Sequence, residues 1–259
     1  MPVEVRLSPL VRRLVAPNAS PMTGGGTNTY LVGVGRVTVI DPGPADPGHI
    51  ERILEAIGDA TVARILLTHG HPDHAPGARP LSSRTGAAVL THPFALRDGA
   101  LLSGGGATLE VLHTPGHTSD HVSLVLREER ALFSGDLIVA GSTVVVAPPD
   151  GDMAAYMASL ERLARERLSR IYPGHGEVIV RPAEAIEQYL RHRRMREEQV
   201  LAALEAGPAR IPELVARIYA EVPAALHGLA AQSVHAHLLK LRAEGRVAGT
   251  DAASPWRRL

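Results

Sequence analysis

Potential metal ligands crowd one short segment of the sequence, LLTHGHPDHAPG. His69, His71, Asp73 and His74 follow an apolar stretch that ends at Thr68. In an extended backbone, residues i and i+2 face the same side, so His69 and His71 can bind one ion together. Asp73 and His74 then turn towards a second position. A polar loop with chance histidines is the alternative, but no helix or strand face explains histidines at this density. The spacing predicts a metal site.

Three further candidate ligands occur in a similar context. His117 follows LEVLH, Asp136 follows ALF in FSGD, and His175 follows RIY in YPGHG, and a glycine immediately precedes each of them. Side chains placed just after strands gather at one edge of a sheet, where α/β folds form their clefts. Each of these residues alone also fits an ordinary loop position. Together with the HxHxDH segment, they predict one cluster of five histidines and two carboxylates.

The composition limits what the cluster can be. The chain has 259 residues, of which 45% are hydrophobic and 21% charged, which is typical of a globular protein. It contains no cysteine, so any metal must be bound by nitrogen and oxygen atoms. No apolar run is long enough to span a membrane and no secretory signal is evident, so we expect a cytoplasmic protein. The preference for arginine over lysine suggests a bacterial source.

The elements that must position these residues fall into two regions. Up to residue 180, short β-rich segments alternate with glycine and proline turns and with helices expected at 48–57 and 152–167. From Glu184 onward the pattern becomes helical. Residues 1–180 carry a net charge of −3 and residues 181–259 a net charge of +3. We therefore predict an α/β catalytic domain at 1–190 and a small helical domain at 191–259.

The chain resembles the metallo-β-lactamase superfamily in the order and spacing of four motifs. They are HxHxDH, the histidine of TPGHT, the aspartate of SGD and the histidine of PGHG. Within this superfamily, the chain is similar to the β-lactamase-like protein 2 subfamily of metal-dependent endoribonucleases, through GGGTNTYLVG, the DPG at Asp41 and TPGHTSDH. The resemblance covers residues 5–180. It implies a four-layered αββα sandwich with metals at one edge, followed by a winged-helix-like domain.

The resemblance also implies a role for each ligand. His69, His71 and His117 would hold the first metal, Asp73, His74 and His175 the second, and Asp136 would bridge them. Two divalent ions about 3.5–4 Å apart can share a water and lower its pKa to about 7, which supplies hydroxide at neutral pH. Asp73 would orient that nucleophile as the catalytic carboxylate. Nitrogen-rich ligation favours Zn²⁺, although iron and manganese also bind such mixed sites.

Other polar residues are candidates for supporting roles. Residues expected to orient the ligands are Asp41, Thr68 and His121, although Asp41 also suits a turn and His121 also suits strand packing. Thr27 and Asn28, in the glycine-rich GGGTNTY, are expected to form a substrate loop, and His92 to line the cleft. The glycines beside Thr27 can equally serve only a turn.

The segment RHRRMR at the start of the second region is basic. Its arginines are candidate phosphate contacts in nucleic-acid binding: Arg191, Arg193, Arg194 and Arg196. A solvated helix face explains them equally well, because Glu197 and Glu198 follow at once and only 3% of the chain is aromatic. The same domain could instead pack across a homodimer.

Three functions are compatible with these observations. The favoured one is a dinuclear zinc-dependent hydrolase that cleaves phosphodiester bonds of single-stranded RNA. The second is hydrolysis of a small carbonyl substrate, such as a thioester, lactone or β-lactam, at the same two-metal site. The third is a nucleic-acid-binding regulator with a degenerate catalytic domain, which the intact ligand set argues against. No membrane partner is expected.

Overall fold

The computed structural model describes residues 4–259, so the first three residues of the predicted 1–190 domain lie outside it. Contacts divide the chain into two compact units. The first runs to Thr114 and also includes Asp120–Ser142 and Arg167–Ala183; the second comprises Pro115–Ser119, Thr143–Glu166 and Glu184–Leu259. The boundary expected near residue 190 lies within α4 (Pro182–Ala203), and the second unit also includes two segments that precede this helix.

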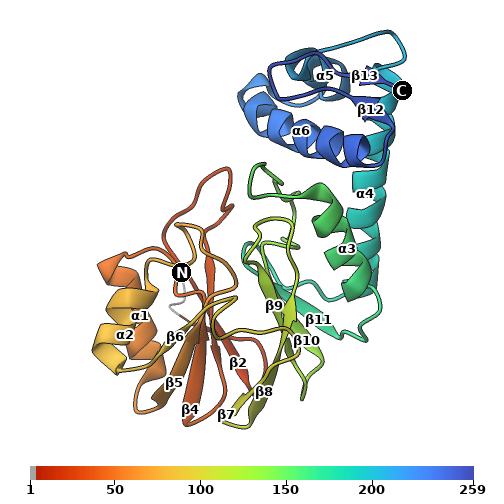
Figure 1. Cartoon of the computed structure of the whole chain (residues 1–259). Helices are drawn as coiled ribbons and strands as arrows, with labels where there is room; N and C mark the ends of the chain where they lie inside the picture. The colour runs from red at the N-terminus through yellow and green to blue at the C-terminus, as the bar shows by residue number, and fades with distance from the viewer. Residues whose placement is uncertain (1–3) are drawn as a thin grey trace. The chain divides into compact units, whose positions relative to one another are not determined.

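The first unit is built on two sheets, drawn in Figure 1. The first sheet has the order β1-β2-β3-β4-β5-β6 and the second the order β11-β10-β9-β8-β7. Strands of the first sheet are β1 (Val5–Arg6), β2 (Val11–Val15), β3 (Asn28–Val32), β4 (Arg36–Ile40), β5 (Thr61–Leu66) and β6 (Val89–Leu90). Strands of the second are β7 (Leu101–Gly104), β8 (Ala107–His113), β9 (Val122–Leu126), β10 (Ala131–Gly135) and β11 (Arg170–Pro173).

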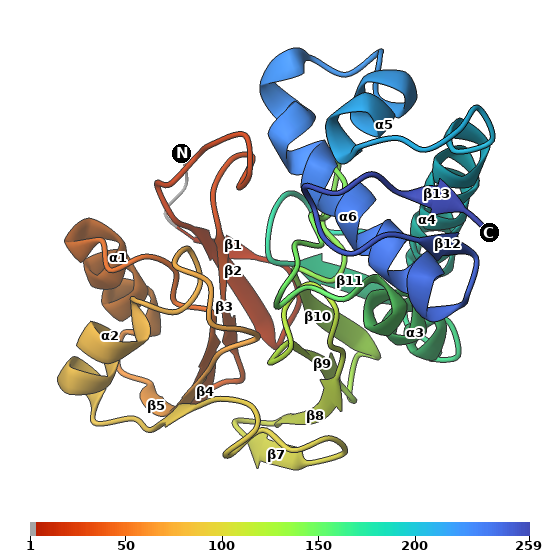
Figure 2. The same cartoon turned by 45° about the horizontal axis from the view of Figure 1, so that its top comes forward.

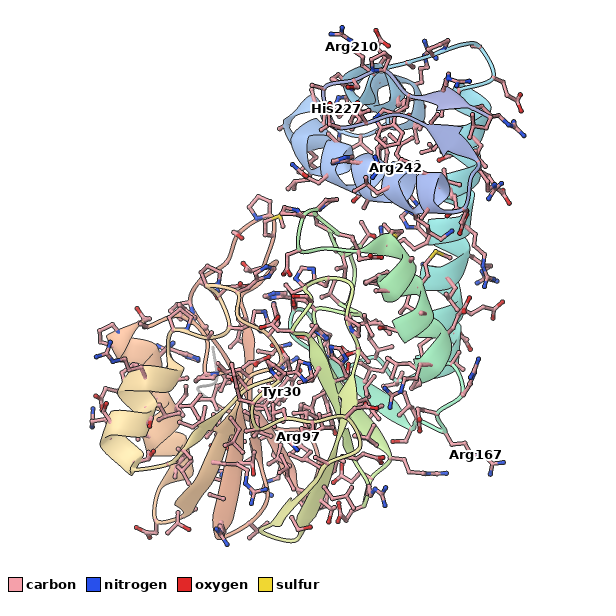
Figure 3. All side chains as sticks on the ribbon, viewed as in Figure 1. Tyr30, Arg97, Arg167, Arg210, His227 and Arg242 are labelled. Carbon is pink, nitrogen blue, oxygen red and sulfur yellow. The ribbon has the colours of Figure 1, made fainter. Side chains whose placement is uncertain are left out.

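The two sheets of this unit share a hydrophobic core. Tyr30 of β3, labelled in Figure 3, packs with Phe133 and Tyr172 of the second sheet, with ring centroids 5.1 and 5.7 Å away. On the other face of the first sheet lie α1 (Pro47–Ile57) and α2 (Ala78–Thr85), whose apolar residues pack against β3, β4 and β5. Alternating buried side chains on both faces explain the nearly continuous apolar sequence of these strands.

Parallel pairing sets where the polar residues lie. β4, β5 and β6 are parallel neighbours, so their carboxyl ends meet at one edge of the first sheet. Asp41 follows β4, and the HxHxDH segment follows β5. In the second sheet, β10 and β11 are also parallel, and they end at Gly135 and Pro173, just before Asp136 and His175. Both sheets therefore deliver polar residues where their parallel strands end.

The second unit contains a small helical core, seen with its top turned forward in Figure 2. Its elements are α3 (Met153–Leu163), α4, α5 (Ile211–Ile218), the 3-10 turn η1 (Ala224–Leu226), α6 (His227–Ala243), β12 (Val247–Ala248) and β13 (Arg257–Arg258). Trp256 is fully buried among apolar residues of α4, α5 and α6. No described helix is long and apolar enough to cross a membrane.

A buried carboxylate ties α4 to α6 in this unit. Glu197 of α4 accepts hydrogen bonds from Lys240 at 2.7 Å and from Arg246 at 3.1 Å. Burial alone would raise the pKa of Glu197, but the hydrogen bond and the charge of Lys240, together with His237 Nδ1 3.8 Å away, lower it to about 2. The ionised form is therefore preferred in the folded protein.

We predict that Glu197→Gln lowers the free energy of unfolding at pH 7 by about 1–3 kcal/mol, because charge-assisted bonds are lost. A folded-state pKa near 2 means that wild type has the full benefit above the unfolded pKa of about 4.3 and loses it as pH falls towards 2. Urea unfolding of both proteins at several pH values measures this. A gap that stays constant with pH would contradict it, and Glu198→Gln, at an exposed position of the same helix, is the matched control.

Candidate metal centre

The structure gathers the predicted ligands into two groups that share one residue. One group is Asp73, His74, Asp136 and His175, and the other is His69, His71, His117 and Asp136. Within each, one ligand atom from every residue lies within 4.8 Å of the others. All seven predicted ligands are thus present in these two groups.

The first of these groups has spacings that suit a cation. His74 Nε2 lies 3.3 Å from His175 Nε2, and Asp136 Oδ1 lies 3.4 Å from each of these nitrogens. Asp73 Oδ2 lies 3.4 Å from His74 Nε2 and 3.2 Å from His175 Nε2. Ligands about 2.0–2.1 Å from a tetrahedral zinc ion are separated by roughly 3.3 Å, so these donors fit such an ion.

Hydrogen bonds on Nδ1 direct the Nε2 atoms of the histidines towards the centre. His74 Nδ1 donates to Asp41 Oδ2 at 3.0 Å, His117 Nδ1 to the Val145 carbonyl at 2.8 Å, and His175 Nδ1 to the Gly26 carbonyl at 3.3 Å. Carbonyl and carboxylate oxygens only accept, so Nδ1 carries a proton, and Nε2 is the nitrogen that can bind an ion once it has released its own proton. This is the tautomer that a ligand needs.

Asp41 is the central acceptor in the hydrogen bonds that orient the ligands. Its carboxylate accepts from the Thr68 amide at 2.8 Å, the Thr68 hydroxyl at 2.7 Å and His74 Nδ1. Because the Thr68 hydroxyl proton points to Asp41, its oxygen accepts from His69 Nδ1 at 3.0 Å. Asp41 adopts a left-handed φ of 48°, a conformation that aspartate tolerates better than most residues. The sequence-based expectation for Asp41 and Thr68 matches these contacts.

His121 positions Asp136, the ligand that both groups share, by accepting a hydrogen bond from the Asp136 backbone amide. The Asp136 amide donates to His121 Nε2 at 3.1 Å, so His121 carries its proton on Nδ1, which faces the Thr114 hydroxyl at 3.0 Å. Gly135 has φ 48°, and a Cβ there would lie 2.7 Å from both His121 Nε2 and Thr68 Oγ1. Only glycine allows the chain to pass this close, which fixes the position of Asp136.

The charges of the carboxylates shape the titration of the cluster. Burial alone would raise the pKa of Asp136 and Asp73, but the charge of His74 on Asp136, and hydrogen bonds from His175 and His74 to Asp73, hold both well below their usual range. Burial would lower the pKa of His175, but hydrogen bonds to Asp136 and Asp73 raise it to about 9. The carboxylates of this cluster therefore favour the binding of protons or cations by the neighbouring histidines.

Thr27 and Asn28 have a structural role that the sequence did not predict. Both are buried, and the Asn28 amide donates at 2.9 Å to the carbonyls of Pro173 and Gly176. Thr27 forms a β-bridge with His175. They hold the loop that carries His175, and their role in a substrate loop stays a prediction. The sequence could not reveal this, because the partner loop lies about 150 residues away.

The linker arginines are also used internally. Arg193 is buried, donates to the Val144 carbonyl and stacks over Tyr156, while Arg196 donates to Ile218 and stacks over Tyr219. Arg194 pairs with Glu161 and Arg191 with Glu187 on the surface. Arg193 therefore cannot act as the phosphate contact that the sequence predicted. The exposed Arg191 and Arg194 keep that role as a prediction.

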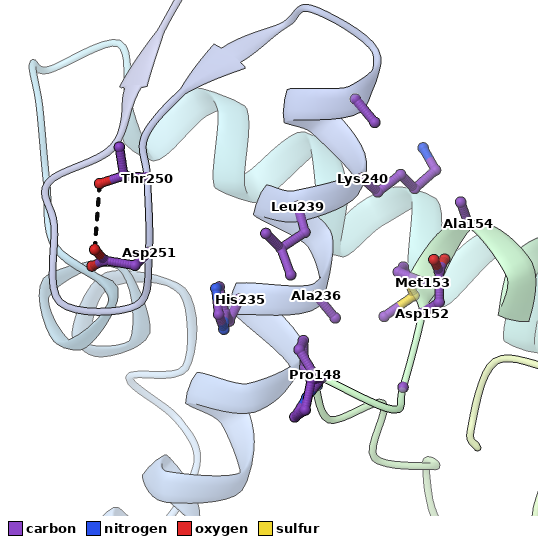
Figure 4. Close-up of a pocket in the computed structure, with 13 residues that line it drawn as sticks. Pro148, Asp152, Met153, Ala154, His235, Ala236, Leu239, Lys240, Thr250 and Asp251 are labelled. Carbon is purple, nitrogen blue, oxygen red and sulfur yellow. Dashed lines mark hydrogen bonds between the residues drawn. The ribbon is translucent and has the colours of Figure 1, made fainter. Parts of the chain in front are cut away.

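A separate cavity of about 510 Å³ lies within the second unit (Figure 4). Its walls come from the segment 148–154 and from α6, with mostly apolar atoms. Lys240 at its rim is already paired with Glu197 and Glu244, and the Thr250 hydroxyl lies 3.5 Å from Asp251. None of its lining residues belongs to either ligand group. The candidate catalytic residues therefore lie at the metal centre and not in this cavity.

The chain is similar to known proteins over the region that contains the metal centre. The family model described as the metallo-β-lactamase superfamily matches residues 22–99 and 91–175. The chain belongs to the metallo-β-lactamase superfamily. A model of the β-lactamase-associated winged-helix domain matches residues 211–256, so the second unit of this superfamily member ends in a winged helix, as the sequence predicted. The predicted fold class is confirmed.

Relatives extend over nearly the whole chain of this metallo-β-lactamase superfamily member. It is 36% identical over 283 residues to the β-lactamase-like protein 2 homolog of Drosophila melanogaster, covering 98% of this chain and 94% of the relative. It is 34% identical to the lactamase-like protein aptB of Emericella nidulans, covering 100% and 89%. A crystal structure of a metallo-β-lactamase family protein from Thermus thermophilus matches with TM-score 0.80 and 26% identity, covering 98% and 100%.

We expect purified protein supplied with zinc to hold about two ions per chain, because there are two ligand groups. Asp136→Asn should reduce both, whereas His175→Ala should reduce the content to about one, since His175 belongs to only one group. Elemental analysis after gel filtration measures this, with His227→Ala as a control outside the groups. Equal losses in the Asp136 and His175 variants would contradict the shared role of Asp136.

Asp41→Asn should weaken metal binding by about 10–100-fold, because the amide cannot replace both acceptor oxygens that fix His74 and Thr68. Competition of the loaded protein with a chromogenic chelator measures the affinity, and circular dichroism checks the fold. Exposed Asp59→Asn is the matched control. An unchanged affinity in a folded Asp41→Asn protein would show that Asp41 does not orient the ligands.

Proposed function

We propose that this protein is a dinuclear, zinc-dependent hydrolase that cleaves phosphodiester bonds of single-stranded RNA. The observation that carries the proposal is that the Asp136 carboxylate belongs to both ligand groups, so two ions would sit side by side. Two divalent ions held there would supply an activated water at neutral pH and neutralise charge on the attacked group and the leaving oxygen. Such a clamp suits in-line displacement at phosphorus.

The protein's own residues complete this chemistry. Asp73 is partly exposed, and its lowered pKa keeps the carboxylate ionised, so it can accept a hydrogen bond from the attacking water and orient it. His69, His74 and His175 are held with Nε2 inward by Thr68, Asp41 and Gly26. The ligands are therefore set in place before substrate arrives, which is the main requirement of electrostatic catalysis.

A carbonyl substrate is the second candidate, and one observation favours it. Arg193 and Arg196 are committed to contacts inside the second unit, which leaves fewer cations than expected for binding a phosphate backbone. The same activated water attacks thioesters, lactones and β-lactams. The relative named lactamase-like protein is consistent with that chemistry.

A side-by-side assay separates the two candidates. We expect the zinc-loaded protein to cleave single-stranded RNA faster than a thioester, a lactone or a chromogenic β-lactam, with Asp73→Asn reducing turnover by about 100-fold or more. Asp59→Asn is the control. Turnover of a carbonyl substrate without RNA cleavage would replace the first candidate by the second, and cleavage retained in Asp73→Asn would remove the assigned role of Asp73.

A further inference from the structure

An exposed aromatic side chain follows one of the parallel strands whose ends carry the metal ligands. Phe94 is 84% exposed, although the chain has only two phenylalanines and the other, Phe133, is fully buried. Phe94 lies in the segment that follows β6, which ends at the same edge of the first sheet as β4 and β5. That edge carries Asp41 and the HxHxDH segment.

The loop that carries Phe94 is well ordered by hydrogen bonds. The amides of Ala95 and Leu96 donate to the Thr91 carbonyl at 2.9 and 3.1 Å, and His92 Nδ1 donates to the Leu96 carbonyl at 2.8 Å. Leu96 is fully buried and anchors the loop in the core between the sheets. Phe94 is therefore held in solvent by a fixed backbone, where its ring makes no contribution to the core.

The base of this loop is linked to the metal ligands through a short series of contacts. The His92 ring stacks on His113 with centroids 4.1 Å apart and planes inclined by 18°. His113 pairs with Val122 across β8 and β9, and the Val122 amide donates to the Thr68 carbonyl at 2.8 Å. Thr68 precedes His69, so this series of contacts connects the stacked pair to the segment that carries the first ligand.

We propose that Phe94, on the loop braced by the His92–His113 stack, contacts a planar base of a single-stranded nucleic acid and is a substrate-binding residue. This inference rests on the proposed function. An aromatic face can stack on any base without reading its identity, and stacking contributes affinity even where few cations are available. Phe94 would thus compensate for the arginines that the second unit uses internally.

The test is binding and cleavage of a short single-stranded RNA by the zinc-loaded full chain. Fluorescence anisotropy in the Asp73→Asn background, in which turnover is expected to fall by about 100-fold, measures binding separately from turnover. Phe94→Ala should weaken binding and raise KM by about 5–100-fold, whereas Phe94→Trp should stay within about 2-fold of wild type. Val34→Ala is the control, because Val34 is 63% exposed in the turn at the opposite end of β4.

Abasic substitutions sharpen the test. Replacing one base at a time by an abasic unit should weaken wild-type binding at one position, and Phe94→Ala should remove that particular penalty. RNA cleavage with equal KM in wild type and Phe94→Ala would overturn the role of Phe94 and leave the proposed function intact. Binding that depends on Phe94 without cleavage would support the contact and refute the nuclease. No RNA binding at all would overturn both.

Discussion

The sharing of one carboxylate between two ligand groups is the constraint on which the site depends. Asp136 must reach His74 and His175 in one group and His69 and His71 in the other. Two contacts hold the backbone of Asp136. Its amide donates a hydrogen bond to His121 Nε2, and the preceding Gly135 passes close to Thr68. The carboxylate position is therefore determined by backbone geometry more than by side-chain freedom.

Polar residues buried beneath the centre form one connected set. Asp41 accepts from Thr68 and His74, Thr68 accepts from His69, and His121 bonds both Asp136 and Thr114. A buried polar group without a partner is costly, so each bond in this set both stabilises the fold and restricts a ligand. The strained backbone of Asp41 belongs to the same set, as is common where the fold positions reactive groups.

Much of the site could be read from the sequence, and the reason is local. His69, His71, Asp73 and His74 lie close together along the chain, and the other ligands follow recognisable strands. The helix predicted at 48–57 is α1, and the one predicted at 152–167 is α3, which begins at Met153 after its cap Asp152 but ends earlier, at Leu163. What the sequence hid depends on distant packing. Arg193 has the character of a surface residue, and only the fold shows Val144 and Tyr156 around it.

The anchoring of the His175 loop has a consequence for the sandwich as a whole. Asn28 and Tyr30 of β3 both donate to the Pro173 carbonyl at the end of β11, so the first sheet grips the loop of the second. His74 follows a strand of the first sheet and His175 a strand of the second. An ion bound by both residues would therefore cross-link the two sheets. The bound ion would then oppose sliding of one sheet relative to the other at the edge that carries the ligands. Loss of the ion would weaken the packing of the hydrophobic core between the sheets.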